Sequence, residues 1–338
     1  MPSRDFHAGS ANPAADTASV SIIIPAYNAA STLARCLDSV FRQAGPDVEV
    51  IVVDDRSSDA TQEVASGYPV RLIALAQHGG SGVARNRGAA AAQGQVLLFT
   101  DADVTLGEGA LSRVRADLAE PGVDAVIGSY DDDPAVRTTI SQFKNLAHHY
   151  FHQRSGPEVT TFWGACGIIG RELFLSMGGF DEELPEMSDV DLGYRLAARG
   201  AHIRLDPALQ VKHLKQWTLK LLLKTDLNLR AFPWAILLLK YGYLPRGLNF
   251  TADQRAAGIL AMLLAVLGAA SLVRPAAAIA LVPCAVLAAW VNRDLYRLFY
   301  RRGGLRLLAG GFLLQQLYYL YSAVGLIAGI ARTLLARR

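Results

Sequence analysis

Apolar and polar positions alternate along residues 20–128 in a pattern that predicts strands separated by helices. Short apolar runs such as "VSIIIP" and "VEVIVV" are typical of buried strands. Between them lie amphipathic stretches such as "STLARCLDSVF", whose apolar side chains share one helical face and for which Ser31 is the expected cap. This alternation predicts an α/β domain with a mostly parallel sheet covered on both faces. The five predicted strands cover residues 20–25, 48–55, 70–76, 95–100 and 124–128.

The pattern changes at residue 212. Residues 212–246 carry seven basic side chains against one acid, Asp226, with leucines and aromatic residues between them. This composition is typical of helices that lie in a membrane interface. A basic surface on a soluble helical cap is the alternative interpretation.

Three long uncharged stretches follow. Residues 256–273 and 275–292 hold 18 uncharged residues each, and residues 307–331 hold 25. We expect three transmembrane spans, because about 20 residues cross the hydrocarbon core. The first two stretches are short, so a re-entrant pair is the alternative. The arginine-rich segment "RDLYRLFYRRGGLR" before the third should face the cytoplasm.

Composition adds limits to this picture. The chain has 338 residues, of which 51% are hydrophobic, and a net charge of +3 that gives no sign of a nucleic-acid partner, so none is expected. The N-terminus has no apolar stretch before Val20, which argues against a signal peptide. We therefore expect a multi-pass protein of the cell inner membrane with a cytoplasmic first domain. The expected parts are a flexible tail (1–18), an α/β domain (19–211), interfacial helices (212–250) and a transmembrane region (251–338).

Acidic side chains follow two of the predicted strands. Asp54 and Asp55 end the second strand, and Asp101 and Asp103 follow the fourth. In parallel sheets such strand ends share the edge where ligands bind. Two neighbouring carboxylates repel each other unless a cation lies nearby or one is protonated. Hard oxygen ligands suit Mn²⁺ or Mg²⁺, although "DAD" taken alone also fits a solvated turn.

Basic side chains open a predicted helix near the same edge. "GGSGVARNRG" puts Arg85 and Arg87 at a helix start after a flexible turn, where anions bind well. Two solvated arginines are the alternative. The acids of "VVDDRSSDAT" can accept from a base N–H or a ribose hydroxyl, and Asp55 can cap the next helix as well.

Taken together, several motifs resemble those of family 2 glycosyltransferases and follow the same order. They are "VSIIIPAYNAASTLARCLDSV", "VIVVDDRSSDAT", "GVARNRGAAAAQGQVLLFTDADV", "FWGACGIIGRELFLSMGGFDEELPEMSDVDLGYRLAARG" and the later "VKH". The resemblance covers about residues 19–215. It implies a GT-A fold, a nucleotide-sugar donor of UDP or GDP type, a divalent metal, and transfer by single displacement with inversion.

The resemblance assigns donor-side roles residue by residue. It implies that Pro25, Ala26 and Tyr27 line the nucleotide pocket and that Asp54 or Asp55 holds the base.

It also assigns a metal site. Arg85 would lie near the base or the diphosphate, Asp101 near the ribose and the metal, and Asp103 would be the main metal ligand. His213 matches a position that is a third metal ligand in some relatives, with a surface histidine as the alternative.

On the acceptor side, Asp189 matches the family's catalytic base, whereas Ser188 stands where a glutamate is common. Glu186 is a rival for the base. Asp191 would turn away from the site or cap the helix, and it can pair with Arg195 four residues on.

"FWGACG" resembles the family's acceptor loop. Trp163 and Gly164 would then lie on the acceptor side, although a tryptophan of the hydrophobic core is an equal alternative for Trp163. His148 and His152 of "HHYFH" share a helical face but lack the further ligands that zinc needs.

These observations predict a membrane-bound glycosyltransferase that acts at the cytoplasmic membrane face on an acceptor that is a membrane lipid or is linked to one. A processive polysaccharide synthase is the second hypothesis, for which three spans are few. A non-catalytic membrane scaffold with a degenerate sugar-nucleotide domain is the third, supported only by Ser188.

Overall fold

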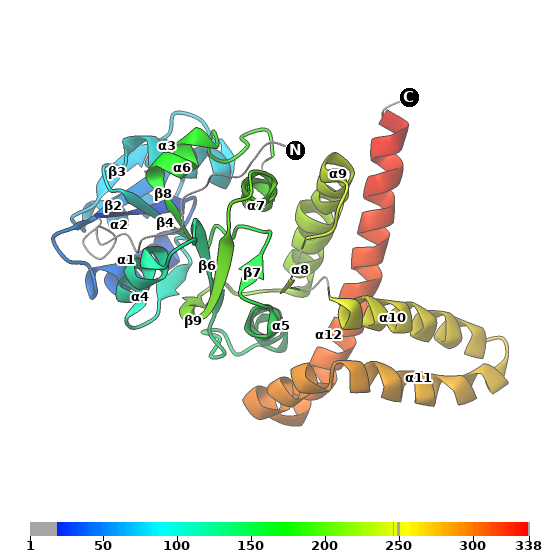
Figure 1. Ribbon diagram of the computed structural model, residues 1–338. Coiled ribbons are helices and arrows are strands. Elements are labelled where there is room, and N and C mark those ends of the chain that lie inside the picture. Colours follow the sequence, from blue (N-terminus) through cyan, green and yellow to red (C-terminus); the bar gives the residue numbers. More distant parts are fainter. Residues whose placement is uncertain (1–18, 185, 246, 249–250, 337–338) are drawn as a thin grey trace. The chain divides into compact units, whose positions relative to one another are not determined.

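The computed structural model describes residues 19–184, 186–245, 247–248 and 251–336 (Figure 1). The predicted tail, residues 1–18, lies outside them. The chain divides into two compact units. The first comprises the described residues up to Ser129 together with Pro157–Val211, and the second comprises Tyr130–Gly156 and the described residues from Lys212 onward.

A single mixed sheet organises the first unit. In the described residues it has nine strands, in the order β3-β2-β1-β4-β8-β6-β9-β5, with β7 paired to β9. The pairs β1–β2, β1–β4 and β2–β3 are parallel, whereas β8 is antiparallel to β4 and β6. The mostly parallel α/β prediction is therefore confirmed. The strands are β1 (Val20–Ala26), β2 (Val48–Asp54), β3 (Arg71–Ala74), β4 (Val96–Thr100), β5 (Val104–Leu106), β6 (Ala125–Tyr130), β7 (Glu158–Val159), β8 (Cys166–Gly170) and β9 (Ile203–His213).

Helices of this unit pack on that sheet. Helix α3 lies against β1 and β2, where a Cβ at Gly88 would come within 2.5 Å of Ile23 Cγ2, so only glycine allows this approach. The helices are α1 (Ala30–Phe41), α2 (Thr61–Ser66), α3 (Gly80–Ala91), α4 (Ala110–Ala119), α6 (Arg171–Ser176) and α7 (Ser188–Ala198).

The predicted cap of α1 is wrong. Ser31 lies inside the helix, and Ala29 occupies the N-cap position. The first backbone N–H groups are instead satisfied from outside the helix, because Thr61 Oγ1 accepts from Ala29 N (2.8 Å) and Asp59 Oδ2 accepts from Ala30 N (3.1 Å). Asp59 and Thr61, from a loop distant in sequence, therefore cap the helix in place of the predicted Ser31.

The second unit is helical. Helices α8 and α9 are joined by a π-helical turn, Leu227–Ala231, and α10 and α11 pack side by side as a hairpin (Figure 1). Helix α12 is broken at Gly304, whose φ of 62° and ψ of −158° are not helical. The helices are α5 (Thr139–Arg154), α8 (Leu219–Asp226), α9 (Phe232–Tyr241), α10 (Ala252–Ser271), α11 (Ala278–Val291) and α12 (Arg293–Ala336).

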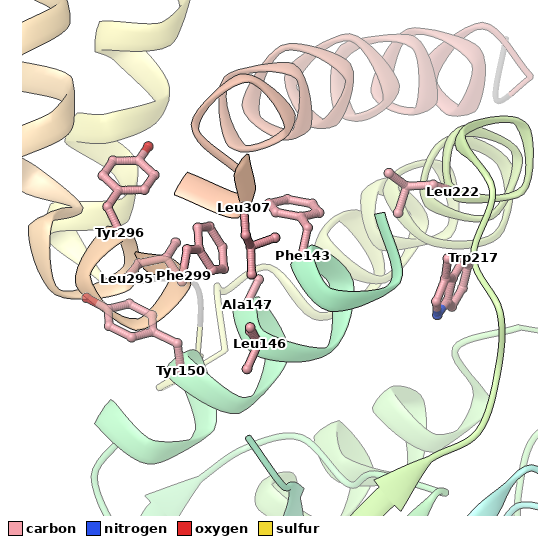
Figure 2. Close-up of a cluster of buried hydrophobic side chains, with 10 residues drawn as sticks. All are labelled: Phe143, Leu146, Ala147, Tyr150, Trp217, Leu222, Leu295, Tyr296, Phe299 and Leu307. Atoms are coloured by element: carbon pink, nitrogen blue, oxygen red, sulfur yellow. The ribbon is translucent and has the colours of Figure 1, made fainter. Parts of the chain in front are cut away.

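A buried apolar cluster joins α5 to the carboxyl-terminal helices. Figure 2 shows α5 side chains packed against α12 residues on both sides of the Gly304 break. This cluster gives the second unit its own core. Its buried members are Phe143, Leu146, Ala147, Tyr150, Trp217, Leu222, Leu295, Tyr296, Phe299 and Leu307.

The prediction of three membrane spans is wrong in number. Among the described residues, only α10 and α12 are long and apolar enough to cross a membrane. The stretch 275–292 instead forms a 3₁₀ turn followed by α11, which has 14 residues and is shorter than the roughly 20 that a span requires. Its apolar side chains are nevertheless exposed, with Ile279 at 78% and Val282 at 68%.

Candidate active site

The acids that end β2 are buried and already hydrogen-bonded. Asp54 accepts from Gln62 Nε2 (2.7 Å) and Ser57 N (3.2 Å). Asp55 accepts from the backbone N–H groups of Gly79 (2.7 Å) and Gly80 (2.8 Å). The two carboxylates therefore fix the loops after β2 and β3, which form one rim of the site.

An aromatic pair lies on that rim. The rings of Tyr27 and His78 are 4.3 Å apart, and each side chain is about half exposed. His78 Nδ1 also lies 2.9 Å from Asp55 Oδ2. Our sequence reasoning missed His78, although a ring directly after a strand and before two glycines was a usable signal. Pro25 and Ala26 precede Tyr27 at the end of β1, with Ala26 buried.

Arg85 provides a positive charge beside the acids that follow β4. Its side chain is 7% exposed and donates from Nη2 to Asp101 Oδ1 at 2.5 Å. Burial and the nearby charges of Asp101 and Asp103 raise the pKa of the Cys36 thiol. The carboxylates of Asp101 and Asp103 therefore both lie near Cys36.

Gly164 connects this charge pair to the candidate base. Its backbone N–H donates to Asp189 Oδ2 at 3.0 Å. A Cβ at this position would lie 2.7 Å from Arg85 Cζ, so the guanidinium rests against the glycine. Contacts thus run from Asp101 through Arg85 and Gly164 to Asp189, which stands in the first turn of α7.

The neighbouring acids of α7 are arranged differently. Asp191 is fully buried and accepts from Arg195 Nε at 2.7 Å, so the predicted pairing is confirmed. Arg195 also donates to the carbonyls of Met177 and Gly179, which ties the helix to the loop before it. Glu186, the rival for the base, is exposed just before the helix.

The donor set at the end of β4 fits a hard divalent cation. Asp101 and Asp103 are both partly exposed and offer carboxylate oxygens, the ligands that Mg²⁺ and Mn²⁺ prefer. Among the described residues, no group of three or more acidic, histidine or cysteine side chains converges to form a complete shell. A cation here would take further ligands from the donor's phosphates.

The contacts described from Asp101 to Asp189 do not include two of the predicted site residues, His213 and Trp163. His213 belongs to the second unit, where its ring stacks on Tyr130 at 4.8 Å, so its role as a third metal ligand stays a prediction. Trp163, beside Gly164, is partly exposed.

Comparison with known proteins bears on this arrangement. Residues 21–177 match the family model described as glycosyl transferase family 2. They include the strand ends with Tyr27 and Asp55, together with Arg85, Asp101 and Gly164. Residues 21–177 form a family 2 glycosyltransferase domain. The matched region ends before α7, so Asp189 lies beyond it.

Curated relatives resemble parts of the chain that contains this glycosyltransferase domain. The succinoglycan biosynthesis protein ExoO of Rhizobium meliloti is 44% identical over 105 residues, which are 30% of each chain. The validoxylamine A glucosyltransferase of Streptomyces hygroscopicus is 31% identical over 220 residues, 54% of this chain and 52% of that protein. The aligned part spans between about a third and a half of the length of such relatives.

Solved structures agree on the fold of the glycosyltransferase domain. A mannosyltransferase of Pyrobaculum calidifontis, crystallised with GDP-Man and Mn²⁺, aligns with a TM-score of 0.50 at 19% identity, over 92% of this chain and 87% of that one. Residues 1–349 of Staphylococcus aureus TarS, crystallised with UDP-GlcNAc, align with a TM-score of 0.50 at 18% identity, over 91% of this chain and 92% of that one. At this identity the likeness supports the GT-A fold alone.

Proposed function

We propose that the chain is a membrane-bound glycosyltransferase that moves a sugar from a UDP- or GDP-type donor to an acceptor hydroxyl, with inversion in a single displacement. The observation that carries the proposal is the run of contacts from Asp101 through Arg85 and Gly164 to Asp189. It joins a donor-side acid to a candidate base. Donors of these two types are named with the two solved structures of the same fold.

The donor nucleotide would lie on the rim that Tyr27 and His78 form. Their exposed rings offer a stacking surface for a base, and Pro25 and Ala26 would line the pocket beside them. Asp55 holds His78 and the glycine turn in place, so its role is to shape the pocket as well as to meet the base.

Asp103 and Asp101 would hold Mn²⁺ or Mg²⁺. When bound, such an ion supplies positive charge that stabilises the diphosphate as it leaves. Arg85 keeps the Asp101 carboxylate oriented through its 2.5 Å hydrogen bond and adds a charge that is nearly fully buried.

Asp189 would act as the base. It takes the proton of the acceptor hydroxyl while the acceptor oxygen bonds to the anomeric carbon and the bond from that carbon to the phosphate oxygen breaks. The Gly164 N–H fixes one oxygen of the Asp189 carboxylate. Trp163 and Gly164 would line the acceptor side. Asp191 would stabilise the position of α7 through its ion pair with Arg195.

The acceptor is a lipid or is linked to one, and the protein lies in the inner membrane with the glycosyltransferase domain in the cytoplasm. Support comes from the length and composition of α10 and α12 and from the exposed apolar side chains of α11. The arginines at the start of α12 favour a cytoplasmic position for that segment.

A donor screen tests the catalytic part of the proposal. Purified full-length protein would be incubated with UDP- and GDP-sugars and Mn²⁺ or Mg²⁺, and released nucleotide would be measured. We expect release with at least one donor, and a loss of about 10²-fold or more in Asp103→Ala. Glu108→Ala, which removes an exposed acid five residues further along the chain, is the control and should keep wild-type turnover. Equal and negligible turnover in wild type and Asp103→Ala would favour the scaffold hypothesis.

A labelled donor tests the acceptor. Membranes that contain the protein would be incubated with radiolabelled nucleotide-sugar and extracted with organic solvent. We expect label in the lipid fraction; label found solely in water-soluble product would contradict a lipid-linked acceptor.

A further inference from the structure

The carboxylate of Asp55 has little capacity left for a nucleobase. Its side chain is 3% exposed. Oδ1 accepts from the backbone N–H of Gly79 at 2.7 Å, and Oδ2 accepts from that of Gly80 at 2.8 Å. His78 Nδ1 lies 2.9 Å from Asp55 Oδ2 and 3.3 Å from the carbonyl oxygen of the same residue. Three donors of the turn after β3 therefore surround the acid that the family resemblance assigns to the base.

These contacts fix the hydrogen-bonding roles of the two imidazole nitrogens of His78. A carboxylate oxygen and a carbonyl oxygen face Nδ1, and both can only accept hydrogen bonds. Nδ1 therefore carries hydrogen, because the bond that one ring nitrogen makes decides the tautomer. In a neutral imidazole the other nitrogen then holds a lone pair. Asp55 thus makes Nε2 of His78 an acceptor.

This acceptor lies at the edge of the sheet where ligands of α/β domains bind. The register pairs Ala26 with Asp54 and Asp54 with Ala74, so the ends of β1, β2 and β3 are level. Tyr27 follows β1 and His78 follows β3, and their rings are 4.3 Å apart and about half exposed. Within the described part of the chain, no residue hydrogen-bonds to Nε2 of His78. An available acceptor therefore lies beside an exposed aromatic ring.

We propose that Nε2 of His78 is the group that determines base specificity, by accepting a hydrogen bond from a ring N–H of the donor's base. Uracil and guanine carry such a hydrogen on a ring nitrogen, whereas cytosine and adenine present a lone pair there, which leaves the acceptor unpaired. The inference rests on the proposed function, because it requires the nucleotide to bind at the Tyr27–His78 rim. It adds the residue that selects uracil or guanine over cytosine or adenine.

Nucleotide binding without a sugar tests this role. Purified full-length protein with Mn²⁺ at pH 8 would be titrated by calorimetry with UDP, CDP, GDP and ADP. UDP and CDP form one pair of equal ring size, and GDP and ADP form the other. We expect the member with the ring N–H to bind about tenfold more tightly in at least one pair, the worth of one hydrogen bond. No preference in either pair, or the opposite preference, would overturn the proposal.

Matched variants assign the preference to one residue. His78→Phe keeps an aromatic ring beside Tyr27 and removes both nitrogens, so the preference should fall to about onefold. His202→Phe is the control, because it removes another exposed imidazole of the first unit, 4.0 Å from Glu158, and should keep the preference. A preference that persists in His78→Phe, or that is lost equally in both variants, would overturn the proposal. The preference is a ratio of two affinities of one preparation, so a partly misfolded variant does not imitate its loss.

A methylated base separates the ring N–H from the neighbouring exocyclic groups. The preferred diphosphate would be compared with its analogue methylated at that ring nitrogen. Wild type should bind the analogue about tenfold more weakly, whereas His78→Phe should bind both within about twofold. Equal binding of the two by wild type would show that the N–H is not recognised.

The outcomes also separate this role from the proposed function. Nucleotide release in the donor screen, without a base preference, would reject the role of His78 alone. No binding of any of the four diphosphates, together with no release in the donor screen, would reject the proposed function and this inference with it.

Discussion

Asp101 in the first unit and Asp226 in the second meet basic side chains at nearly equal distances, 2.5 Å from Arg85 and 2.6 Å from Lys144. Their surroundings differ. The Asp101 side chain is 33% exposed, whereas that of Asp226 is 3% exposed and also accepts from Tyr321. An ion pair with a solvent-facing acid leaves oxygen available to a ligand, whereas one with a buried, fully engaged acid fixes helices to one another. Distance alone does not distinguish the two roles.

The largest expected effect is on turnover and concerns Asp189, the candidate base. Asp189→Asn should lower turnover by about 10³-fold, because an amide cannot take the acceptor's proton while its oxygen still accepts from Gly164. Donor KM should stay within about twofold, because the donor-side groups are intact. Steady-state kinetics would measure both constants.

Glu186→Gln is the control for this prediction. It removes the exposed rival and should leave turnover near wild type. A large loss in Glu186→Gln together with a small one in Asp189→Asn would exchange the roles of the two acids.

The structural side of the comparison can be tested at Asp226. Asp226→Ala should destabilise the protein by about 3 kcal/mol, because the nearly buried ammonium of Lys144 loses its partner. Chemical unfolding in detergent, followed by circular dichroism, would measure this change.

Asp294→Asn serves as the matched case for Asp226, because its partner Arg154 is half exposed. It should change the free energy of unfolding by less than about 1 kcal/mol. Equal effects would remove the distinction between a buried and an exposed pair. Lys144→Met/Asp226→Leu should recover most of the lost stability, since apolar residues of similar size replace buried pairs well.

A smaller effect is expected where Arg85 rests on the acceptor loop. Gly164→Ala places a Cβ within 2.7 Å of Arg85 Cζ and should push the guanidinium away from Asp101. We expect donor KM to rise about tenfold, the equivalent of one charge-assisted hydrogen bond. Gly170→Ala, where a Cβ meets nothing within 4 Å, should leave KM unchanged. A wild-type KM in Gly164→Ala would show that Arg85 does not orient the donor.

The last prediction concerns the pH dependence of stability. It involves Asp117, an acid of the first unit outside the candidate active site. Burial, and then the charge of Asp206, raise the pKa of Asp117 from its ordinary 3.8 to about 7. Between these values the folded protein holds a proton that the unfolded chain has lost. The stabilisation is therefore complete below pH 3.8 and is lost as the pH rises through 7.

Asp117→Asn should avoid this loss, so it should be more stable than wild type at pH 8, with little difference at pH 4. Unfolding midpoints at both pH values would measure it. An equal difference at both would show that the carboxyl does not titrate in this range.

Local pattern was enough for much of the first unit. The alternation of apolar runs and amphipathic stretches predicted its parallel strands, and carboxyl ends of such strands must share an edge, so the position of Asp55 and Asp101 on one side followed. The i, i+4 pair of Asp191 and Arg195 also depended only on helical spacing.

Contacts between distant segments could not be read from local pattern. Ser31 had the chemistry of a cap, but Thr61 and Asp59 reach the helix start from another loop. His78 lies at the site because the turn after β3 is hydrogen-bonded to Asp55, which follows β2.

The sequence by itself determined the α/β domain, its family motifs and the basic and apolar character of the second half, because these depend on residue type and short-range period. Tertiary structure alone decided that Arg85 lies against Gly164, that α5 belongs to the carboxyl-terminal helices, and that Lys144 and Lys215 share one indole. Each of these contacts joins segments far apart in the chain, and packing of the whole unit sets their distance.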